Sequence, residues 1–217
     1  IREIGAILKE FPNCRLHVDA TQAVGKAPLI LDGVDTMSLA PHKFYGLNGS
    51  GLLLKRQELM IEPQIHGGNS TTLYRSGSPA LALASSAEIA LRLALENQED
   101  RIRYVNTLNQ FLREKLAQYP AVRFNSPENA VPHILNLSVQ GVKGTVFQKA
   151  LGEHGVCVSV KSACSTEGSP SKAVFAVNRD RRNALSSWRI SLSHLTTREE
   201  LQEFLQIFDA CYKELVP

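Results

Sequence analysis

The strongest constraint on the fold is a set of short apolar runs that do not alternate with polar residues. Residues 16–18 form one such run, which ends at Asp19, and residues 37–40 form a second, which ends at the sequence Pro-His-Lys over 41–43. A third run, residues 51–54, follows a glycine-rich turn. Unalternating apolar strands are typical of a sheet that is covered on both faces by helices. The sequence therefore predicts an α/β fold.

Helical patterns surround these strands. Apolar residues at helical spacing predict a short amphipathic helix over residues 1–11. Residues 80–119 contain no Gly or Pro and are rich in residues that favour helix. The apolar period lapses near residues 97–100, which predicts two helices. We place a domain boundary there, so that residues 1–98 form one domain and residues 99–217 a second.

The chain after Pro120 alternates more closely between strands and helices. We expect a helix over residues 144–154, a polar loop before the last strand, and strands over residues 134–139, 156–160 and 188–192. Thr196 and Glu199 have the spacing of a capping box, which predicts the start of a final helix. The apolar face of that helix carries Leu201, Phe204, Leu205 and Phe208.

Composition and charge exclude several classes of function. The 24 Lys and Arg against 21 Asp and Glu give a net charge of +3 with no long basic run, so we expect no nucleic-acid partner. No apolar stretch approaches the roughly 18 residues of a membrane span and no signal peptide is visible, which predicts a cytoplasmic protein without a membrane partner. The six His and four Cys lack metal-ligand spacing, so we expect no metal site.

Asp19 and Lys43 are candidate functional residues because each directly follows a predicted strand. An open α/β sheet presents its ligand crevice at this edge. Pyridoxal phosphate requires such a pair, with a lysine amine to form a Schiff base and a carboxylate to keep the pyridine nitrogen protonated. On these two residues alone, an aspartate that caps a helix and a surface lysine are the more common explanation.

The surrounding sequence changes that balance. His-Val-Asp-Ala-Thr-Gln, residues 17–22, and Ser-Leu-Ala-Pro-His-Lys-Phe-Tyr-Gly, residues 38–46, resemble the cofactor motifs of the class V aminotransferases, and specifically of the cysteine desulfurases. The resemblance implies four contacts with pyridoxal phosphate: the pyridinium nitrogen with Asp19, the ring hydroxyl with Gln22, the phosphate with His42, and a covalent Schiff base with Lys43.

Cys164 is the candidate nucleophile. It lies in a segment of small and polar residues, 160–170, which predicts a mobile surface loop in which an exposed thiol could move between cofactor and acceptor. On composition alone, an incidental cysteine explains it equally well. Ser-Ala-Cys-Ser, however, resembles the desulfurase loop that carries the persulfide-forming cysteine. The other cysteines lie in or beside apolar segments, and we expect them to pack in the core: Cys14, Cys157 and Cys211.

Two further residues complete the predicted site. Arg189 lies in an otherwise apolar strand, where its guanidinium requires an anionic partner, either an internal carboxylate or a ligand. The resemblance implies that Arg189 holds the α-carboxylate of the amino-acid substrate. A glycine-rich stretch, residues 66–79, is either a phosphate cradle or a plain loop. The family often has Arg-Ser-Gly-Thr here, and Ser78 retains the hydroxyl that would reach the phosphate of a neighbouring subunit.

The resemblance implies a type I pyridoxal-phosphate transferase fold that is incomplete. The motifs correspond to the second half of a desulfurase, and the chain opens with Ile1 rather than Met, so we expect it to belong to a larger protein. Residues 1–98 would be part of the large, mainly parallel-sheet domain, and residues 99–217 the small C-terminal domain with the cysteine loop.

The implied activity converts L-cysteine to L-alanine and leaves a persulfide on Cys164. A homodimer would pass this sulfur to an acceptor protein, either a scaffold for iron-sulfur clusters or a thiolation carrier. We expect the chain alone to bind pyridoxal phosphate weakly and to be inactive. The alternatives are another class V lyase or transaminase, for which Cys164 has no role, and a non-catalytic fragment that binds a partner.

Overall fold

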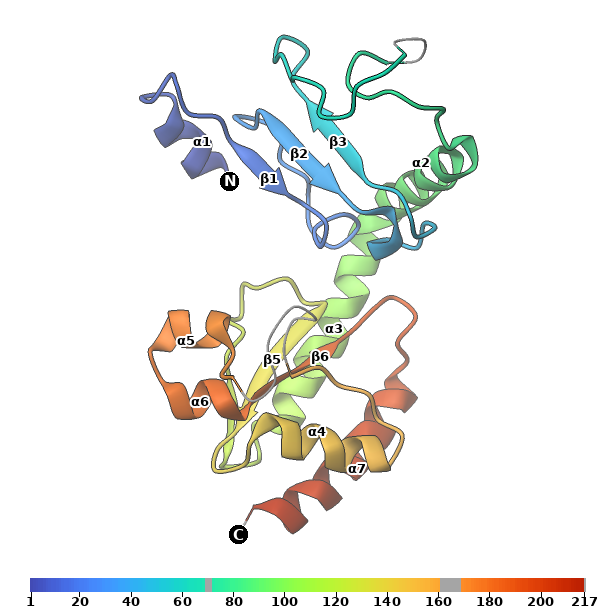
Figure 1. The fold of residues 1–217 in the computed structure, drawn as a ribbon. Helices are drawn as coiled ribbons and strands as arrows, with labels where there is room; N and C mark the ends of the chain where they lie inside the picture. The colour runs from blue at the N-terminus through green and yellow to red at the C-terminus, as the bar shows by residue number, and fades with distance from the viewer. Residues whose placement is uncertain (69–71, 161–168, 217) are drawn as a thin grey trace. The chain divides into compact units, whose positions relative to one another are not determined.

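The chain folds into two compact α/β units, Ile1–Gln98 (unit 1) and Glu99–Pro217 (unit 2), each with its own three-stranded sheet (Figure 1). The computed structural model describes residues 1–68, 72–160 and 169–216. The boundary lies between two helices, α2 (Leu81–Glu96) and α3 (Gln98–Leu116), which are separated by Asn97. The lapse in apolar periodicity near residue 97 therefore marks a real helix end.

Unit 1 is built around a mixed sheet with the strand order β1-β2-β3. Its other elements are α1 (Arg2–Leu8), β1 (His17–Asp19), β2 (Thr36–Leu39), the 3-10 turn η1 (Pro41–Lys43) and β3 (Leu52–Lys55). β1 pairs with β2 in parallel and β2 pairs with β3 antiparallel. The parallel pair brings the carboxyl ends of β1 and β2 to one edge of the sheet.

The core of unit 1 covers only one face of that sheet. Met37 and Leu39 of β2 are buried and belong to one cluster with Ala90 and Ala94 of α2. The β2 residues between them are only partly buried, and Leu53 of β3 is 58% exposed. The expectation of a sheet covered on both faces is therefore wrong for the described residues, because burial alternates along β2.

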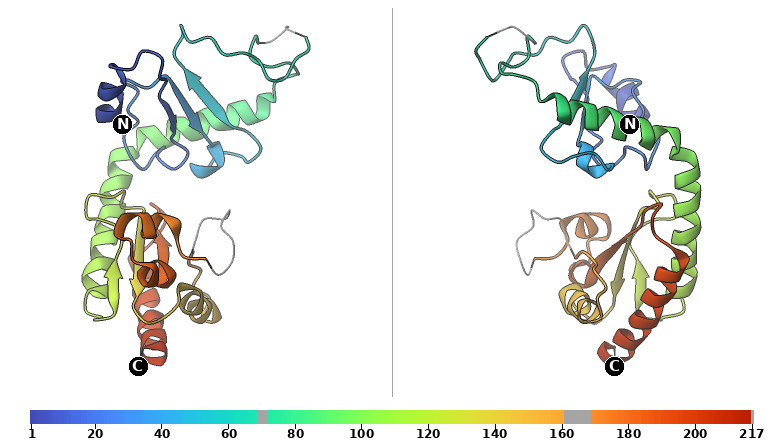
Figure 2. Two further views of the ribbon diagram at one scale, coloured as in Figure 1. Left: turned by 60° about the vertical axis from the view of Figure 1, so that its left-hand side comes forward. Right: turned by 90° about the vertical axis from the view of Figure 1, so that its right-hand side faces the viewer.

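Unit 2 contains an antiparallel sheet with the order β4-β5-β6. Besides α3 it comprises β4 (Val122–Phe124), β5 (Ile134–Val139), α4 (Gly144–Glu153), α5 (Lys172–Asn178), α6 (Arg181–Ser186), β6 (Ser187–Ser191) and α7 (Arg198–Leu215). Helix α3 runs along one side of the sheet, and α5 and α6 lie on the other (Figure 2). The two faces of the sheet therefore have different neighbours.

A large aromatic core fills unit 2 on the α3 side. Leu135 and Leu137 of β5 are fully buried, as is Trp188 of β6. The Trp188 ring stacks on Phe147 of α4 with 5.4 Å between centroids, and Phe147 also contacts Phe208 of α7 at 5.2 Å. Aromatic side chains bury large apolar areas, so this cluster supplies much of the packing energy of unit 2.

Most of the predicted elements are present, but unit 2 departs from the prediction in five places. The sequence did not predict β4, α5 or α6, which are short and contain no long apolar period. Residues 156–160 form no strand, and only Ser159 bridges to Arg189. The capping box lies one residue later than predicted, at Thr197 and Glu200. The hydroxyl of Thr196 instead accepts a hydrogen bond from the backbone N–H of Ser193.

The cysteines were only partly predicted. Cys211 of α7 is 1% exposed and packs in the core as expected. Cys14 and Cys157 are exposed, so the expectation that they pack in the core is wrong. Cys14 follows the turn after α1. Cys157 lies between Val156 and Val158, which pack against the core, in a segment that joins the sheet only through the bridge at Ser159.

Replacing Gly144 by alanine should destabilise unit 2, whereas the same change at Gly152 of the same helix should stabilise it. A Cβ at Gly144 would lie 2.5 Å from the backbone carbonyl oxygen of Ser187, while a Cβ at Gly152 would meet no atom within 4 Å. We expect Gly144→Ala to lower the free energy of unfolding by about 1–3 kcal/mol and Gly152→Ala to raise it by about 0.5–1 kcal/mol. Urea unfolding followed by the fluorescence of Trp188 measures both. Equal stability of the two variants would contradict the close contact.

Candidate functional site

The carboxyl edge of the β1–β2 pair carries the first predicted functional residues. Asp19 is the last residue of β1 and pairs in register with Ser38 of β2. β2 ends one residue later, and the chain then enters the turn η1, which contains His42 and Lys43. The parallel pairing therefore brings Asp19 and η1, which we call the lysine turn, to the same edge of the sheet in unit 1.

The lysine turn is anchored on both sides of its exposed residues. Pro41 and Phe44 are buried, whereas His42 and Lys43 between them are exposed. The N–H of Phe44 and the N–H of Gly46 both donate to the carbonyl of Pro41, at 3.0 and 2.9 Å. A Cβ at Gly46 would lie 2.8 Å from the Cβ of Pro41, so the close return of the chain requires glycine here. The turn thus presents Lys43 from a fixed backbone.

Lys26 connects two of the predicted cofactor residues. Its ammonium Nζ donates to Oε1 of Gln22 at 2.8 Å and to the carbonyl oxygen of Lys43 at 3.4 Å. Because Oε1 of Gln22 accepts from Lys26, the Nε2 of Gln22 remains as a donor. Partial burial and then the nearby charge of Lys43 lower the pKa of Lys26. The sequence prediction missed Lys26, although a lysine four residues after Gln22 was the available signal.

Asp19 is held in its ionised form by Thr21. The backbone N–H of Thr21 donates to Oδ1 of Asp19 at 2.9 Å. The Thr21 hydroxyl and this N–H are the two largest causes that lower the pKa of Asp19, and the neighbouring charge of His17 lowers it further. Hydrogen bonds to the charged form of a carboxyl favour that form. Asp19 is therefore an anion at neutral pH, as a partner for a protonated ring nitrogen must be.

The glycine-rich stretch of unit 1 has no regular secondary structure. The Ser76 hydroxyl donates to the carbonyl of His66 at 2.9 Å, and Nε of Arg75 donates to the carbonyl of Ser76 at 3.1 Å. Ser78 is exposed and forms no hydrogen bond with a described residue. The hydrogen bond from Ser76 to His66 thus links two parts of this stretch. The phosphate contact of Ser78 stays a prediction.

Arg189 lies in unit 2, on the face of the sheet that points away from the aromatic core. It pairs in register with Asn136 of β5 and lines a cavity of about 620 Å³. Its Nε is buried and has no hydrogen-bond partner within the described part of the chain. The internal salt bridge considered for Arg189 is absent among the described residues. Cys164 lies outside the residues that the structure describes.

The described residues contain neither a cluster of metal ligands nor a membrane-spanning helix. No group of three or more His, Cys, Asp or Glu side chains there could hold a metal ion. None of the described helices combines the length and the apolar character needed to cross a membrane.

Comparison with known proteins identifies the family of the chain. The family described as Aminotransferase class-V matches residues 1–204. The chain belongs to the class V aminotransferase family. The elements that carry Asp19, Lys43 and Arg189 all lie within the matched residues.

Individual class V relatives cover nearly the whole chain. The NifS/IcsS protein homolog of Lactobacillus delbrueckii subsp. bulgaricus is 32% identical over 98% of this chain and 57% of its own length. Cysteine desulfurase IscS of Dictyoglomus turgidum is 34% identical over 99% of this chain and 56% of its own length. The NifS-like protein of Rickettsia africae has a solved structure that matches with a TM-score of 0.87 and 26% identity, over 98% of this chain and 57% of that one. The chain thus spans about half the length of the relatives it matches.

Removing the Thr21 hydroxyl should raise the pKa of Asp19. In Thr21→Val the backbone N–H still donates to Asp19, but the side-chain hydrogen bond that lowers the pKa most is lost. We expect the Asp19 carboxyl carbon to titrate at a higher pH in an NMR titration. Asp19 contributes its stability above the pKa of the unfolded chain and loses it as the pH falls through the lower, folded pKa. Thr21→Val should narrow the pH interval between the folded and unfolded pKa of Asp19. The control Thr145→Val, at an exposed residue of α4, should leave the Asp19 titration unchanged.

Proposed function

We propose that this chain carries the lysine, aspartate and cysteine of a pyridoxal-phosphate-dependent cysteine desulfurase, which converts L-cysteine to L-alanine. The observation that carries the proposal is the sheet edge in unit 1. There β1 ends at the anionic Asp19, and its parallel partner β2 leads into the anchored turn with the exposed Lys43. Relatives named cysteine desulfurase cover almost all of the chain and support the same activity.

The residues at this edge fit pyridoxal phosphate. The group requires an amine, a carboxylate that stays ionised, and a donor for its ring hydroxyl. Lys43 is exposed, Asp19 has a lowered pKa, and Gln22 has a free Nε2 because its Oε1 is occupied by Lys26. When bound, the cofactor accepts electrons from the substrate α-carbon into its protonated ring.

Each residue then has a defined task. Asp19 keeps the pyridine nitrogen protonated, Gln22 donates to the ring hydroxyl, and His42 contacts the phosphate. The amine of Lys43 would hold the cofactor covalently and would move the α-proton of the substrate. Ser78 contributes its hydroxyl to the phosphate of a neighbouring subunit in a homodimer.

Unit 2 supplies the substrate carboxylate site and the nucleophile. The guanidinium of Arg189 binds the α-carboxylate of cysteine through two parallel hydrogen bonds. The Cys164 thiolate attacks the substrate sulfur and forms the S–S bond of a persulfide, while the Cβ–S bond of the substrate breaks. That electron pair takes up a proton at carbon, and alanine leaves. The persulfide then passes to a thiol of an acceptor protein, a cluster scaffold or a thiolation carrier, in the cytoplasm.

In this proposal residues 1–98 are part of the large cofactor-binding domain, and residues 99–217 form the small domain with the cysteine loop. The relatives are about twice as long as the matched region. The remaining half would supply further donors to the phosphate and a group that stacks on the ring. Each missing charge-assisted hydrogen bond weakens binding by about 1.5–3 kcal/mol. The 217-residue chain alone should therefore bind the cofactor weakly and be inactive.

Reduction with borohydride should place the cofactor on Lys43. The chain would be combined with the N-terminal half of a relative, loaded with pyridoxal phosphate, reduced and digested for mass spectrometry. We expect the modified peptide to contain Lys43 and to disappear in Lys43→Ala. The exposed Lys9→Ala control should keep it. A modified peptide that contains Lys26 instead would show that the neighbouring amine holds the cofactor.

Sulfur transfer should depend on Cys164 and not on Cys157. Both cysteines belong to unit 2, and Cys157 is an exposed thiol that serves as the matched control. In the same combined protein, Cys164→Ala should lose sulfide release from cysteine while substrate still changes the cofactor spectrum. Cys157→Ala should release sulfide at the wild-type rate. Undiminished release in Cys164→Ala would favour a class V lyase that needs no cysteine nucleophile.

A further inference from the structure

The unit 2 sheet has a polar face opposite its aromatic core. β5 alternates between buried Leu135 and Leu137 on one side and Asn136 and Ser138 on the other, because successive side chains of a strand point to opposite faces. Arg189 lies opposite Asn136 in the register between β5 and β6. We call Arg123, Asn136, Ser138 and Arg189 the polar face. It borders the 620 Å³ cavity through Arg123, Asn136 and Arg189.

Asn136 and Arg189 form a pair whose side chains are close neighbours. The backbone N–H and carbonyl of Arg189 bond to Ser159 at 2.7 and 3.2 Å, on the other side of β6. The backbone N–H of Asn136 donates to the Ser126 hydroxyl at 2.9 Å, away from β6. The two residues therefore form a non-hydrogen-bonded antiparallel pair, in which opposite side chains lie closest.

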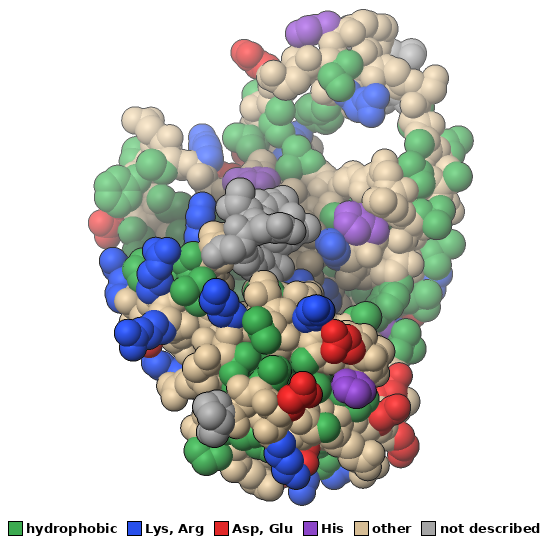
Figure 3. Space-filling model, turned by 60° about the horizontal axis from the view of Figure 1, so that its bottom comes forward, with side chains coloured by type: hydrophobic (Ala, Val, Ile, Leu, Met, Phe, Trp, Pro, Cys, Tyr) green, Lys and Arg blue, Asp and Glu red, His purple; other side chains and the backbone are tan. Residues whose placement is uncertain are grey.

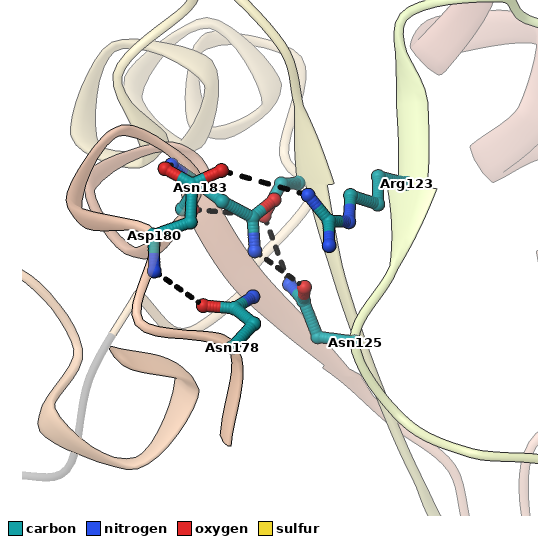
Figure 4. Close-up of polar contacts among 6 residues, drawn as sticks. Arg123, Asn125, Asn178, Asp180 and Asn183 are labelled. Carbon is teal, nitrogen blue, oxygen red and sulfur yellow. Dashed lines mark hydrogen bonds and ion pairs between the residues drawn. The ribbon is translucent and has the colours of Figure 1, made fainter. Parts of the chain in front are cut away.

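A network of amides fixes the orientation of Asn136. Nδ2 of Asn125 donates to Oδ1 of Asn136 and to the hydroxyl of Ser138, both at 2.8 Å. Oδ1 of Asn125 in turn accepts from Nδ2 of Asn183 at 2.7 Å, and Figure 4 shows Asn125 and Asn183 facing each other across this contact. Because Oδ1 of Asn136 is held by Asn125, its Nδ2 is left for the cavity. No described residue accepts from that Nδ2.

The charges around the cavity favour an anion. Among the described residues, its lining includes the cations Arg123, Lys172 and Arg189 and no carboxylate. Arg123 is already paired with Asp180 at 3.5 Å, as Figure 4 shows, whereas the buried Nε of Arg189 has no partner among the described residues. Lysine and arginine side chains also gather on the side of the molecule where α5 and α6 lie (Figure 3). Among the described cavity cations, Arg189 is therefore the one with a buried donor that lacks an acceptor.

We propose that Nδ2 of Asn136 and the guanidinium of Arg189 together bind one carboxylate group. The assignment of this group to the α-carboxylate of the amino-acid substrate rests on the proposed function. Arg189 supplies the charge and two donors in one plane, and Asn136 supplies a third donor from the adjacent strand. Because Asn125 fixes the direction of the Asn136 amide, its N–H donor favours a carboxylate oxygen over a spherical anion such as chloride.

Acetate is a suitable probe because it carries the carboxylate alone. The ¹⁵N-labelled 217-residue chain would be titrated with sodium acetate, with sodium chloride at matched ionic strength as the reference. We expect the Nε–H signal of Arg189 and the side-chain NH₂ signal of Asn136 to move together and to saturate with acetate only. A wild-type Asn136 signal that stays still at saturation, or that moves equally with chloride, would overturn the proposal.

Two variants separate the donor from the charge. Asn136→Asp keeps the acceptor for Asn125 but replaces the donor by a negative charge, and Asn136→Leu removes the donor without a charge. Both should weaken acetate binding about tenfold or more, as expected for a lost hydrogen bond to a charged group. The control Asn106→Asp has the same charge change on the exposed surface of α3 and should bind acetate as the wild type does. Weakening in Asn136→Asp but not in Asn136→Leu would reject the donor role.

A loss of folding and a failure of the proposed function can each be distinguished from a failure of carboxylate binding. The fluorescence of buried Trp188, in the strand that carries Arg189, reports whether each variant keeps the core of unit 2. If neither variant folds, the wild-type titration alone decides the proposal. If acetate binds as expected but the combined protein does not act on cysteine, the carboxylate site stands and the proposed desulfurase function fails.

Discussion

The alternation of side chains along short β-strands is the constraint on which both units depend. In each sheet one set of side chains packs against helices, and the intervening set is left for polar contacts. Met37 and Leu39 of β2 attach the first sheet to α2, while Leu135 and Leu137 of β5 attach the second to its aromatic core. A shift of register by one residue would exchange these sets. The packing of the core therefore also determines where the functional side chains point.

The two units place their functional groups in different ways. In unit 1 the groups lie beyond the ends of parallel strands, where the chain must turn, and the turn at Lys43 is fixed by buried Pro41 and Phe44. In unit 2 the groups lie within the strands, on the polar face, and their positions follow from the register of Asn136 with Arg189. A strand end permits a side chain to move, whereas a strand interior holds it. Under the proposed function, the first position suits Lys43, which would move a proton, and the second suits Arg189, which would hold a carboxylate.

The sequence allowed the prediction of elements with long patterns and of residues in recognisable motifs. Composition was sufficient for α2 and α3, and the class V motifs led to Asp19 and Lys43. The spacing of Lys26 from Gln22 was a local signal that was missed. Asn136 could not be found in this way, because its contact with Asn125 depends on tertiary structure. The same is true of exposed Cys157, whose apolar neighbours suggested a strand that the structure does not form. Local spacing also predicted Thr196 as the helix cap, but the Thr196 hydroxyl accepts from Ser193 and the cap is Thr197.

Hydrogen-bond satisfaction distinguishes Asn125 from Arg189 in unit 2. Asn125 uses both donors of its amide and its carbonyl oxygen in contacts with described residues, so it is complete without a ligand. Arg189 keeps a buried Nε without a partner among the same residues, on the same face of the same sheet. A buried donor without a partner costs about 1–3 kcal/mol, and more when the group is charged. The amide oxygen of Asn136, which lies opposite Arg189 in the register, accepts from Asn125 instead. The cost at Arg189 is therefore a consequence of keeping the guanidinium available, and an anion in the cavity would remove it.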